Sequence, residues 1–226
     1  MPSHSLEVLS SLPPTVPAPL AELAEAWTSA AQPAVPRPAA SVVLCRDGET
    51  GLETFLLHRH ARMAFAASMV VFPGGGLDLA DRSDDDPWRA AGVRETREET
   101  GVQLDPADLL AWAHWITPVV HPIRYDTRFF LAALPPGQLA ADLSTETDRA
   151  GWARPADALA RYGAGTWTMM PPTVSILVEL AAATTVAQLV ESGHDRRVEV
   201  VLPELVRAGT SWEYRYPRPS TRGGLR

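Results

Sequence analysis

Three glutamates, Glu95, Glu98 and Glu99, stand close together in the segment RETREETG, residues 94–101. At about 100° per residue in an α-helix, Glu98 lies roughly 60° to one side of Glu95, and Glu99 lies roughly 40° to the other. All three carboxylates then project from one face, where charges spaced three and four residues apart repel each other. Such a face is either a solvated charged surface or a site for a hard divalent cation, which prefers carboxylate oxygen.

Both ends of this helix are marked in the sequence. Asp86 can cap the N-terminus, and Pro87 suits the first helical position. Gly101 is the residue expected just past a helix end. Because Arg and Glu propagate a helix well, the pattern predicts a helix over residues 87–100 that carries the three glutamates.

The glutamate segment follows FPGGG at residues 72–76, where glycines let the backbone approach a ligand closely. Together these segments resemble the Nudix box: Gly, five residues, Glu, seven residues, then Arg-Glu-apolar-x-Glu-Glu-x-Gly-apolar. Here Gly75 is followed after five residues by Asp81 in place of Glu, and 12 residues separate Asp81 from Arg94. Thr96 replaces the usual aliphatic residue. The resemblance to the Nudix hydrolase superfamily implies an α/β/α sandwich with a mixed β-sheet.

The resemblance also implies roles for single residues. Glu95, Glu98 and Glu99 would hold Mg²⁺ or Mn²⁺, and Arg94 would pair with a carboxylate and orient the helix. Such metals neutralise charge on a diphosphate and activate the attacking water. Glu146 precedes a predicted strand and is a candidate for the catalytic base that some Nudix enzymes draw from a loop. The loop glycines Gly74 and Gly75 would border the substrate.

A second resemblance concerns the substrate. Residues 55–75 resemble the coenzyme A diphosphatase branch of the superfamily in the spacing of Arg59 and Phe72. Leu57, His60, Ala64 and Ser68 depart from that pattern, and Arg62 would substitute for a missing basic residue. Downstream, WITP, RYDTRFFLAAL, GWARPADAL and MMPPT resemble the peroxisomal type of this branch. The arginines that would grip substrate phosphates are Arg59, Arg62, Arg124 and Arg128.

We therefore expect a metal-dependent hydrolase that cleaves the diphosphate bond of a nucleoside diphosphate derivative, with coenzyme A or acyl-coenzyme A favoured. The alternative enzyme cleaves ADP-ribose, NADH or another dinucleotide. A Nudix-like module that senses a nucleotide without turnover is the third possibility. The intact set Glu95, Glu98 and Glu99 argues against that third possibility, because a binder does not need all three. A homodimer is left open.

The amino-acid composition limits the binding partners and the cellular compartment that we expect. The formal net charge of −7 argues against bulk electrostatic binding to nucleic acid or to an anionic membrane. The single cysteine, Cys45, excludes an intrachain disulfide and favours a reducing compartment. We find no apolar run of membrane-spanning length and no signal-peptide pattern at the N-terminus. These features predict a cytoplasmic protein.

The amino-acid composition along the chain predicts an N-terminal arm followed by one domain. Residues 1–38 are rich in Pro and Ala and read as an arm with a short helix around residues 19–31; residues 39–226 would form the Nudix domain, with its C-terminal helix and tail. Within the domain, apolar periodicity predicts one long helix over residues 171–190. Strands are predicted within residues 40–47, 52–60, 69–72, 111–118, 126–134 and 148–154, a helix at 155–162, and a possible edge strand within 196–205.

Overall fold

A computed structural model describes residues 8–28, 31–62, 66–144 and 146–217. The strands are β1 (Arg37–Gly48), β2 (Gly51–Arg59), β3 (Val70–Val71), β4 (Gly74–Gly76), β5 (Leu110–Ile116), β6 (Tyr125–Ala133), β7 (Thr147–Ala153), β8 (Val200–Val201), β9 (Glu204–Ala208) and β10 (Ser211–Arg215). The helices are α2 (Ala18–Ala26), α3 (Pro87–Thr100), α4 (Pro155–Gly163), α5 (Pro171–Ala181) and α6 (Val186–His194), with short 3-10 turns η1 (Asp81–Ser83) and η2 (Pro106–Asp108).

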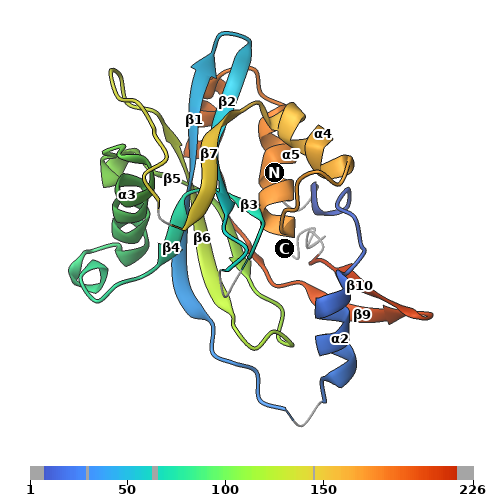
Figure 1. Ribbon diagram of the computed structural model, residues 1–226. Helices are drawn as coiled ribbons and strands as arrows, with labels where there is room; N and C mark the ends of the chain where they lie inside the picture. Colours follow the sequence, from blue (N-terminus) through green and yellow to red (C-terminus); the bar gives the residue numbers. More distant parts are fainter. Residues whose placement is uncertain (1–7, 29–30, 63–65, 145, 218–226) are drawn as a thin grey trace, which may run out of the picture.

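A mixed β-sheet forms the middle layer of the molecule. Its strands follow the order β3-β2-β1-β6-β5-β8, and β4 and β7 pair with β1 and β2 respectively. The pairs β1–β6 and β5–β8 are parallel, whereas the remaining pairs of the sheet are antiparallel. Helix α3 lies on one side of the sheet, and α4 and α5 lie on the other (Figure 1). The predicted α/β sandwich with a mixed sheet is confirmed.

The central strand β1 is buried on both faces. Because strand side chains alternate between faces, Val42 and Leu44 join the apolar cluster beneath α3, while Val43 and Cys45 join the cluster beneath α5. All four side chains have no exposed surface. A near-continuous apolar run is the sequence expected for a strand covered by helices on both sides. The buried strand gives α3 a fixed platform.

Helix α3 begins and ends where the sequence predicts. Asp86 caps it by accepting hydrogen bonds from the N–H groups of Trp88 and Arg89, both at 3.2 Å. Gly101 closes it with a left-handed φ of 77°. Gly92 lets the helix approach β1 closely, because a Cβ there would come within 3.1 Å of the Val42 side chain. The helix therefore has a fixed length and a fixed distance from the sheet.

The predicted single helix over residues 171–190 is wrong. The chain forms α5 and α6 instead, with a bend of 110° between them. Thr185 caps α6 by accepting a backbone hydrogen bond, and the Asp47 carboxylate accepts another from the Val186 N–H at 2.8 Å. Apolar periodicity continues through the break because both helices bury their apolar faces in the same cluster. Apolar periodicity alone therefore predicts one continuous helix, whereas the caps at the start of α6 divide it into two.

No single described helix is long and apolar enough to cross a membrane. The bent pair α5 and α6 passes that test by length and composition alone.

Residues of the predicted arm pack against the C-terminal hairpin β9–β10 (Figure 1). The Tyr214 N–H donates to the Pro14 carbonyl at 2.7 Å, and Glu25 pairs with Arg207. Helix α2 is shorter than the predicted helix, and residues 1–7 and 29–30 lie outside the described residues. The predicted edge strand corresponds to β8, whereas the hairpin was not predicted. The division of the chain at residue 38 stays a prediction.

Candidate active site

A cavity of about 520 Å³ lies where α3 meets β4 and the ends of neighbouring strands. Its lining combines charged, glycine and apolar residues. The charged ones are Arg59, Glu95, Glu98, Glu99 and Glu146. The glycines are the three residues of β4, and the apolar or aromatic ones include Phe72, Tyr125, Phe129 and Met170. The structure therefore brings the three predicted metal glutamates to one cavity with Arg59, Gly74, Gly75 and Glu146.

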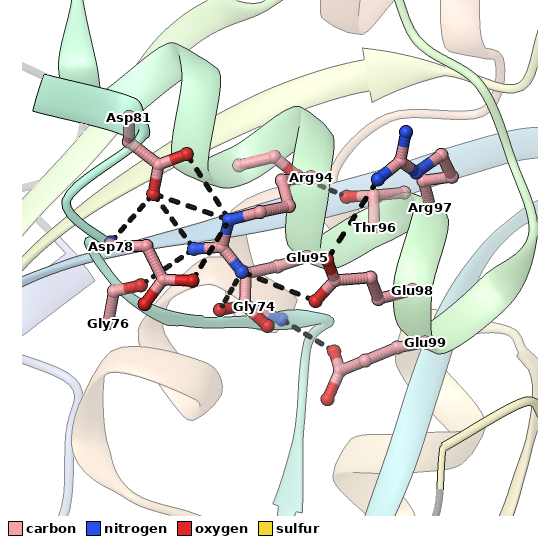
Figure 2. Close-up of polar contacts among 11 residues, drawn as sticks. Gly74, Gly76, Asp78, Asp81, Arg94, Glu95, Thr96, Arg97, Glu98 and Glu99 are labelled. Carbon is pink, nitrogen blue, oxygen red and sulfur yellow. Dashed lines mark hydrogen bonds and ion pairs between the residues drawn. The ribbon is translucent and has the colours of Figure 1, made fainter. Parts of the chain in front are cut away.

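Glu99 is the most buried of the three glutamates, with 8% of its surface exposed. Its Oε2 accepts a hydrogen bond from the Gly74 N–H at 2.8 Å (Figure 2). Burial raises the pKa of Glu99 to about 7, although the Gly74 N–H acts in the opposite direction. The negative charges of Glu95 and Glu146 raise this pKa further, and Arg59 lowers it. A bound cation would favour the ionised form of this carboxyl group.

The glycines of β4 let the backbone lie against the glutamates. A Cβ on Gly75 would come within 2.4 to 2.8 Å of the Glu95 carboxylate atoms, so any larger residue would push that carboxylate away. Gly74 has a φ of 154°, and a Cβ there would lie 2.3 Å from the Ala40 carbonyl oxygen. Because side chains are excluded at both positions, the strand β4 fits closely against β1 and α3.

Arg94 connects the glutamates to the loop before the helix (Figure 2). Its Nη1 donates to Glu95 at 2.8 Å and to Glu98 at 3.3 Å. Its Nη2 donates to the Gly76 carbonyl and to the Asp81 carboxylate, both at 2.9 Å. One guanidinium thus relieves the repulsion between two glutamates and ties their helix to β4. The predicted pairing of Arg94 with a carboxylate is present in the structure.

Asp81 anchors Arg94 from behind and is not part of the cavity lining. Its side chain is 5% exposed. Burial raises the pKa of Asp81, but hydrogen bonds from Arg94 and from the Asp78 N–H outweigh burial and hold this pKa below its usual value. The sequence left the role of Asp81 open because of the long spacer. In the structure the spacer forms the rest of η1, a short loop and the beginning of α3, and Asp81 still reaches Arg94.

The donor set can be tested for its fit to a divalent cation. Glu95, Glu98 and Glu99 offer the carboxylate oxygens that Mg²⁺ and Mn²⁺ prefer, and burial raises the pKa of both Glu95 and Glu99. Within the described residues, no three acidic, His or Cys side chains already form a metal-binding group. Arg94 instead engages Glu95 and Glu98. The residues therefore fit a cation chemically, and a cation would compete with Arg94 for two of them.

Arg59 and Glu146 meet at the same cavity from different strands. Arg59 ends β2, Glu146 immediately precedes β7, and their Nη2 and Oε2 atoms lie 2.9 Å apart. The Arg59 side chain is 17% exposed and the Glu146 side chain 52%. Two residues that the sequence assigned to separate roles are thus partners in this structure.

The structure does not bring the other three predicted arginines to the cavity. Arg62 is exposed and outside the lining. Arg124 is buried and donates to two backbone carbonyl groups at 3.0 and 2.8 Å. Arg128 lies between Thr127 and Phe129, which line the cavity, so strand alternation turns it to the opposite face. There its guanidinium stacks over a tryptophan ring at 3.7 Å.

Sequence reasoning missed the residues that form the apolar part of the lining. Tyr125, Thr127 and Phe129 come from alternate positions of β6, and that alternation is the signal that would have found them. Met170 and Pro172 come from the start of α5, where the sequence shows only a helix boundary.

Fold and site together define the Nudix class, in which the glycine strand and the glutamate helix of the Nudix box meet at one cavity on a mixed sheet. The NUDIX domain model matches residues 35–171, and the chain belongs to this family.

Similar proteins are found among curated chains and solved structures. "Putative nudix hydrolase 7" of Caenorhabditis elegans is 30% identical, and the match covers 64% of this chain and 60% of that protein. The chain thus spans less than two thirds of that relative. A NUDIX hydrolase from Alicyclobacillus acidocaldarius is 26% identical, with a TM-score of 0.62 over 70% of this chain and 96% of its own.

A more distant structure shares the fold alone. The NUDIX domain of Shewanella oneidensis NrtR, crystallised with ADP ribose, is 16% identical to this chain. Its TM-score is 0.50, and the match covers 72% of this chain and 96% of the NrtR chain.

Proposed function

We propose that this chain hydrolyses the diphosphate bond of a nucleoside diphosphate derivative, with Mg²⁺ or Mn²⁺ held by Glu95, Glu98 and Glu99. The observation that carries this proposal is that all three carboxylates line one cavity together with the β4 glycines and Arg59. A diphosphate is anionic and resists attack by water, so its hydrolysis needs positive charge near its oxygens and an acceptor for the proton of water. Membership of the NUDIX family supports the same reaction class.

A bound divalent cation would neutralise the diphosphate oxygens and acidify the attacking water. The chain's own residues do the rest. Arg94, held by Asp81, keeps Glu95 and Glu98 on the cavity side of α3. The Gly74 N–H fixes the Glu99 carboxylate, and the bare backbone of β4 leaves room for phosphate groups.

Coenzyme A or acyl-coenzyme A is the substrate we propose first. Its support is the spacing of Arg59 and Phe72, both of which line the cavity. Arg62, the second basic residue of that pattern, is exposed and lies outside the lining. ADP-ribose, NADH and other dinucleotides are the alternative substrates. ADP-ribose is bound by the Shewanella NUDIX domain of the same fold, which places it in any substrate panel.

Purified protein incubated with Mn²⁺ or Mg²⁺ and a panel of coenzyme A, ADP-ribose and NADH tests the proposal. From coenzyme A we expect 3′,5′-ADP and 4′-phosphopantetheine, which identifies both the substrate and the cleaved bond. A preference for ADP-ribose over coenzyme A would leave the hydrolase standing and remove the coenzyme A proposal. Tight nucleotide binding with no product from any member would instead support the nucleotide-sensing module.

The 3′-phosphate of coenzyme A gives a sharper comparison. Arg59 could bind either that phosphate or the diphosphate, and only in the first case should 3′-dephospho-coenzyme A react about 10- to 100-fold more slowly in kcat/KM. The Arg59→Ala variant should lose this discrimination, whereas Arg62→Ala should keep it. Equal rates of the two substrates with unaltered protein would contradict a 3′-phosphate site. The cytoplasmic location and the homodimer stay predictions.

A further inference from the structure

Arg59 has hydrogen-bonding capacity that the structure leaves unused. It is the only basic residue among the described residues that line the cavity, and the chain contains no lysine. Its Nη2 contacts Glu146, but its Nε is buried and has no hydrogen-bond partner. Buried donors are nearly always paired in folded proteins, so Glu146 satisfies only part of the hydrogen-bonding capacity of the Arg59 guanidinium.

A β-bulge selects Glu146 as the carboxylate that faces Arg59. The pairing of β2 with β7 is regular as far as His58, and then Arg59 pairs with Thr147, so Asp148 is an extra residue. The Asp148 carboxylate lies 2.5 Å from a ring nitrogen of His60. Because bulges redirect side chains beside active sites, the neighbouring acidic residue is diverted to His60 and Glu146 is left to Arg59.

The segment before Glu146 is fixed to the end of the glutamate helix. The Ala141 N–H donates to the Thr100 carbonyl, and the Leu143 N–H donates to the Glu99 carbonyl, both at 3.0 Å. These bonds satisfy carbonyl groups that the last turn of a helix otherwise leaves unpaired. The His60 N–H donates to the Glu146 carbonyl at 2.9 Å, so the backbone of Glu146 is held next to Arg59 whether or not its side chain is paired.

We propose that Glu146 pairs with Arg59 only until a substrate diphosphate arrives, when the diphosphate takes the guanidinium and frees the Glu146 carboxylate within the cavity. The inference rests on the proposed function for its ligand. Glu146 is half-exposed and contacts Arg59 through a nitrogen–oxygen pair at 2.9 Å, and pairs of that kind contribute little to stability. A diphosphate carries more charge and offers several oxygens that match the guanidinium fork.

The exchange makes Glu146, the base predicted from the sequence, available only when substrate is bound. Once freed, its carboxylate accepts a proton as an O–H bond of water breaks and the water oxygen bonds to phosphorus. The bond between that phosphorus and the bridging oxygen breaks, and the electron pair leaves with the second phosphate. Arg59 is then both a ligand of the substrate and the positioning residue that keeps Glu146 paired in its absence.

Binding of α,β-methylene-ADP, whose bridging carbon prevents hydrolysis, tests the exchange by calorimetry in the presence of Mg²⁺. Glu146→Gln removes the competitor of the diphosphate, so this variant should bind the analogue about three- to fivefold more tightly than the unaltered protein. Arg59→Gln should bind it about tenfold more weakly. The matched control is Asp148→Asn, which removes a charge two residues away and should leave the affinity unchanged.

The double variant Arg59→Gln, Glu146→Gln separates exchange from simple repulsion. If Glu146 acts by occupying Arg59, its removal should give no gain once Arg59 is absent. A gain that persists in the double variant, or an unchanged or weaker affinity of Glu146→Gln, would overturn the proposal. Melting curves confirm that each variant is folded.

Turnover supplies a second readout with the best substrate of the panel. Glu146→Gln should lower kcat by about 10²-fold or more while KM falls, a combination that a purely structural role does not give. An unchanged kcat would overturn the proton-accepting role. Because the calorimetry needs no turnover, a protein that hydrolyses no panel member but shows the predicted affinities would contradict only the proposed function.

Discussion

Arg94 and Arg59 serve the same cavity, yet their surroundings differ. Both side chains are 17% exposed, but Asp81, which anchors Arg94, is 5% exposed, while Glu146, which pairs with Arg59, is 52% exposed. Arg94 donates hydrogen bonds to three carboxylates and a backbone carbonyl and forms an ion pair with Asp78, whereas the side-chain contact of Arg59 is with one carboxylate. The two arginines are equally exposed, and their carboxylate partners differ. The buried partner Asp81 makes Arg94 a fixed support, whereas the half-exposed partner Glu146 leaves Arg59 in a contact that a ligand can replace.

The largest effect is expected on the Arg94 side of the cavity. Glu98→Gln and Glu99→Gln keep side-chain volume but remove the charge that would hold the cation, so each should lower turnover by at least about 10²-fold without unfolding the protein. Glu191→Gln is the matched control, since Glu191 is an exposed carboxylate of helix α6 outside the cavity lining. Near-normal Mn²⁺-dependent activity of either glutamine variant would remove the metal assignment.

Removing the carboxylate partner of Arg94 should lower the free energy of unfolding more than removing the carboxylate partner of Arg59. Asp81→Asn leaves a buried guanidinium short of its anchor and should reduce the free energy of unfolding by about 2–4 kcal/mol. Glu146→Gln breaks a half-exposed pair and should cost less than about 1 kcal/mol. Urea unfolding of both variants measures the difference. Equal losses of free energy of unfolding in the two variants would contradict the proposed difference between Arg94 and Arg59.

A divalent cation should stabilise the folded protein through Glu95, Glu98 and Glu99, and not through Glu146. Mg²⁺ that binds only the folded state adds about 2.7 kcal/mol at one hundred times its dissociation constant, so the melting temperature should rise with its concentration. The triple variant Glu95→Gln, Glu98→Gln, Glu99→Gln should not respond, whereas Glu146→Gln should respond as the unaltered protein does. A melting curve indifferent to millimolar Mg²⁺ and Mn²⁺ would argue against the site.

The smallest effect concerns pH at His58, the residue before Arg59 in β2, which lies outside the cavity lining. Burial lowers the pKa of His58 to about 4, and the charges of Arg149 and Arg161 contribute. In the unfolded chain His58 binds a proton below about pH 6.5, but in the folded chain only near pH 4. Its contribution to stability is therefore present above pH 6.5 and is lost as pH falls through this window. Urea unfolding of His58→Gln beside the unaltered protein should show a difference that shrinks from pH 7 to pH 4; a constant difference would contradict it.

The features that sequence predicted well are those coded within a short stretch. Asp86, Pro87 and Gly101 mark the ends of α3 because capping is a local backbone requirement. The glutamates face one cavity because helical spacing alone sets their directions. The Arg94 network was partly predictable, since all its members lie between residues 76 and 98.

Features that depend on distant partners were not predictable. Glu146 pairs with Arg59 across 87 residues, and a bulge within β7 decides which acidic residue faces it. Arg128 was assigned to the substrate because strand patterns do not say which face a cavity occupies, and strand alternation turns it away. Likewise, the break between α5 and α6 depends partly on Asp47, a residue of β1 that accepts a hydrogen bond from the start of α6.

The contact between the early chain and the C-terminal hairpin has a consequence for biosynthesis. Val16 is buried and its N–H donates to the Trp212 carbonyl at 3.4 Å, but this strand of the hairpin is made about 200 residues later. At roughly 5–20 residues per second, a ribosome needs about 10–40 s to bridge that interval. During this time the segment around Val16 lacks the strand with which it finally pairs. The nascent chain thus has a defined window of exposure to chaperones, which closes only when the hairpin leaves the exit tunnel.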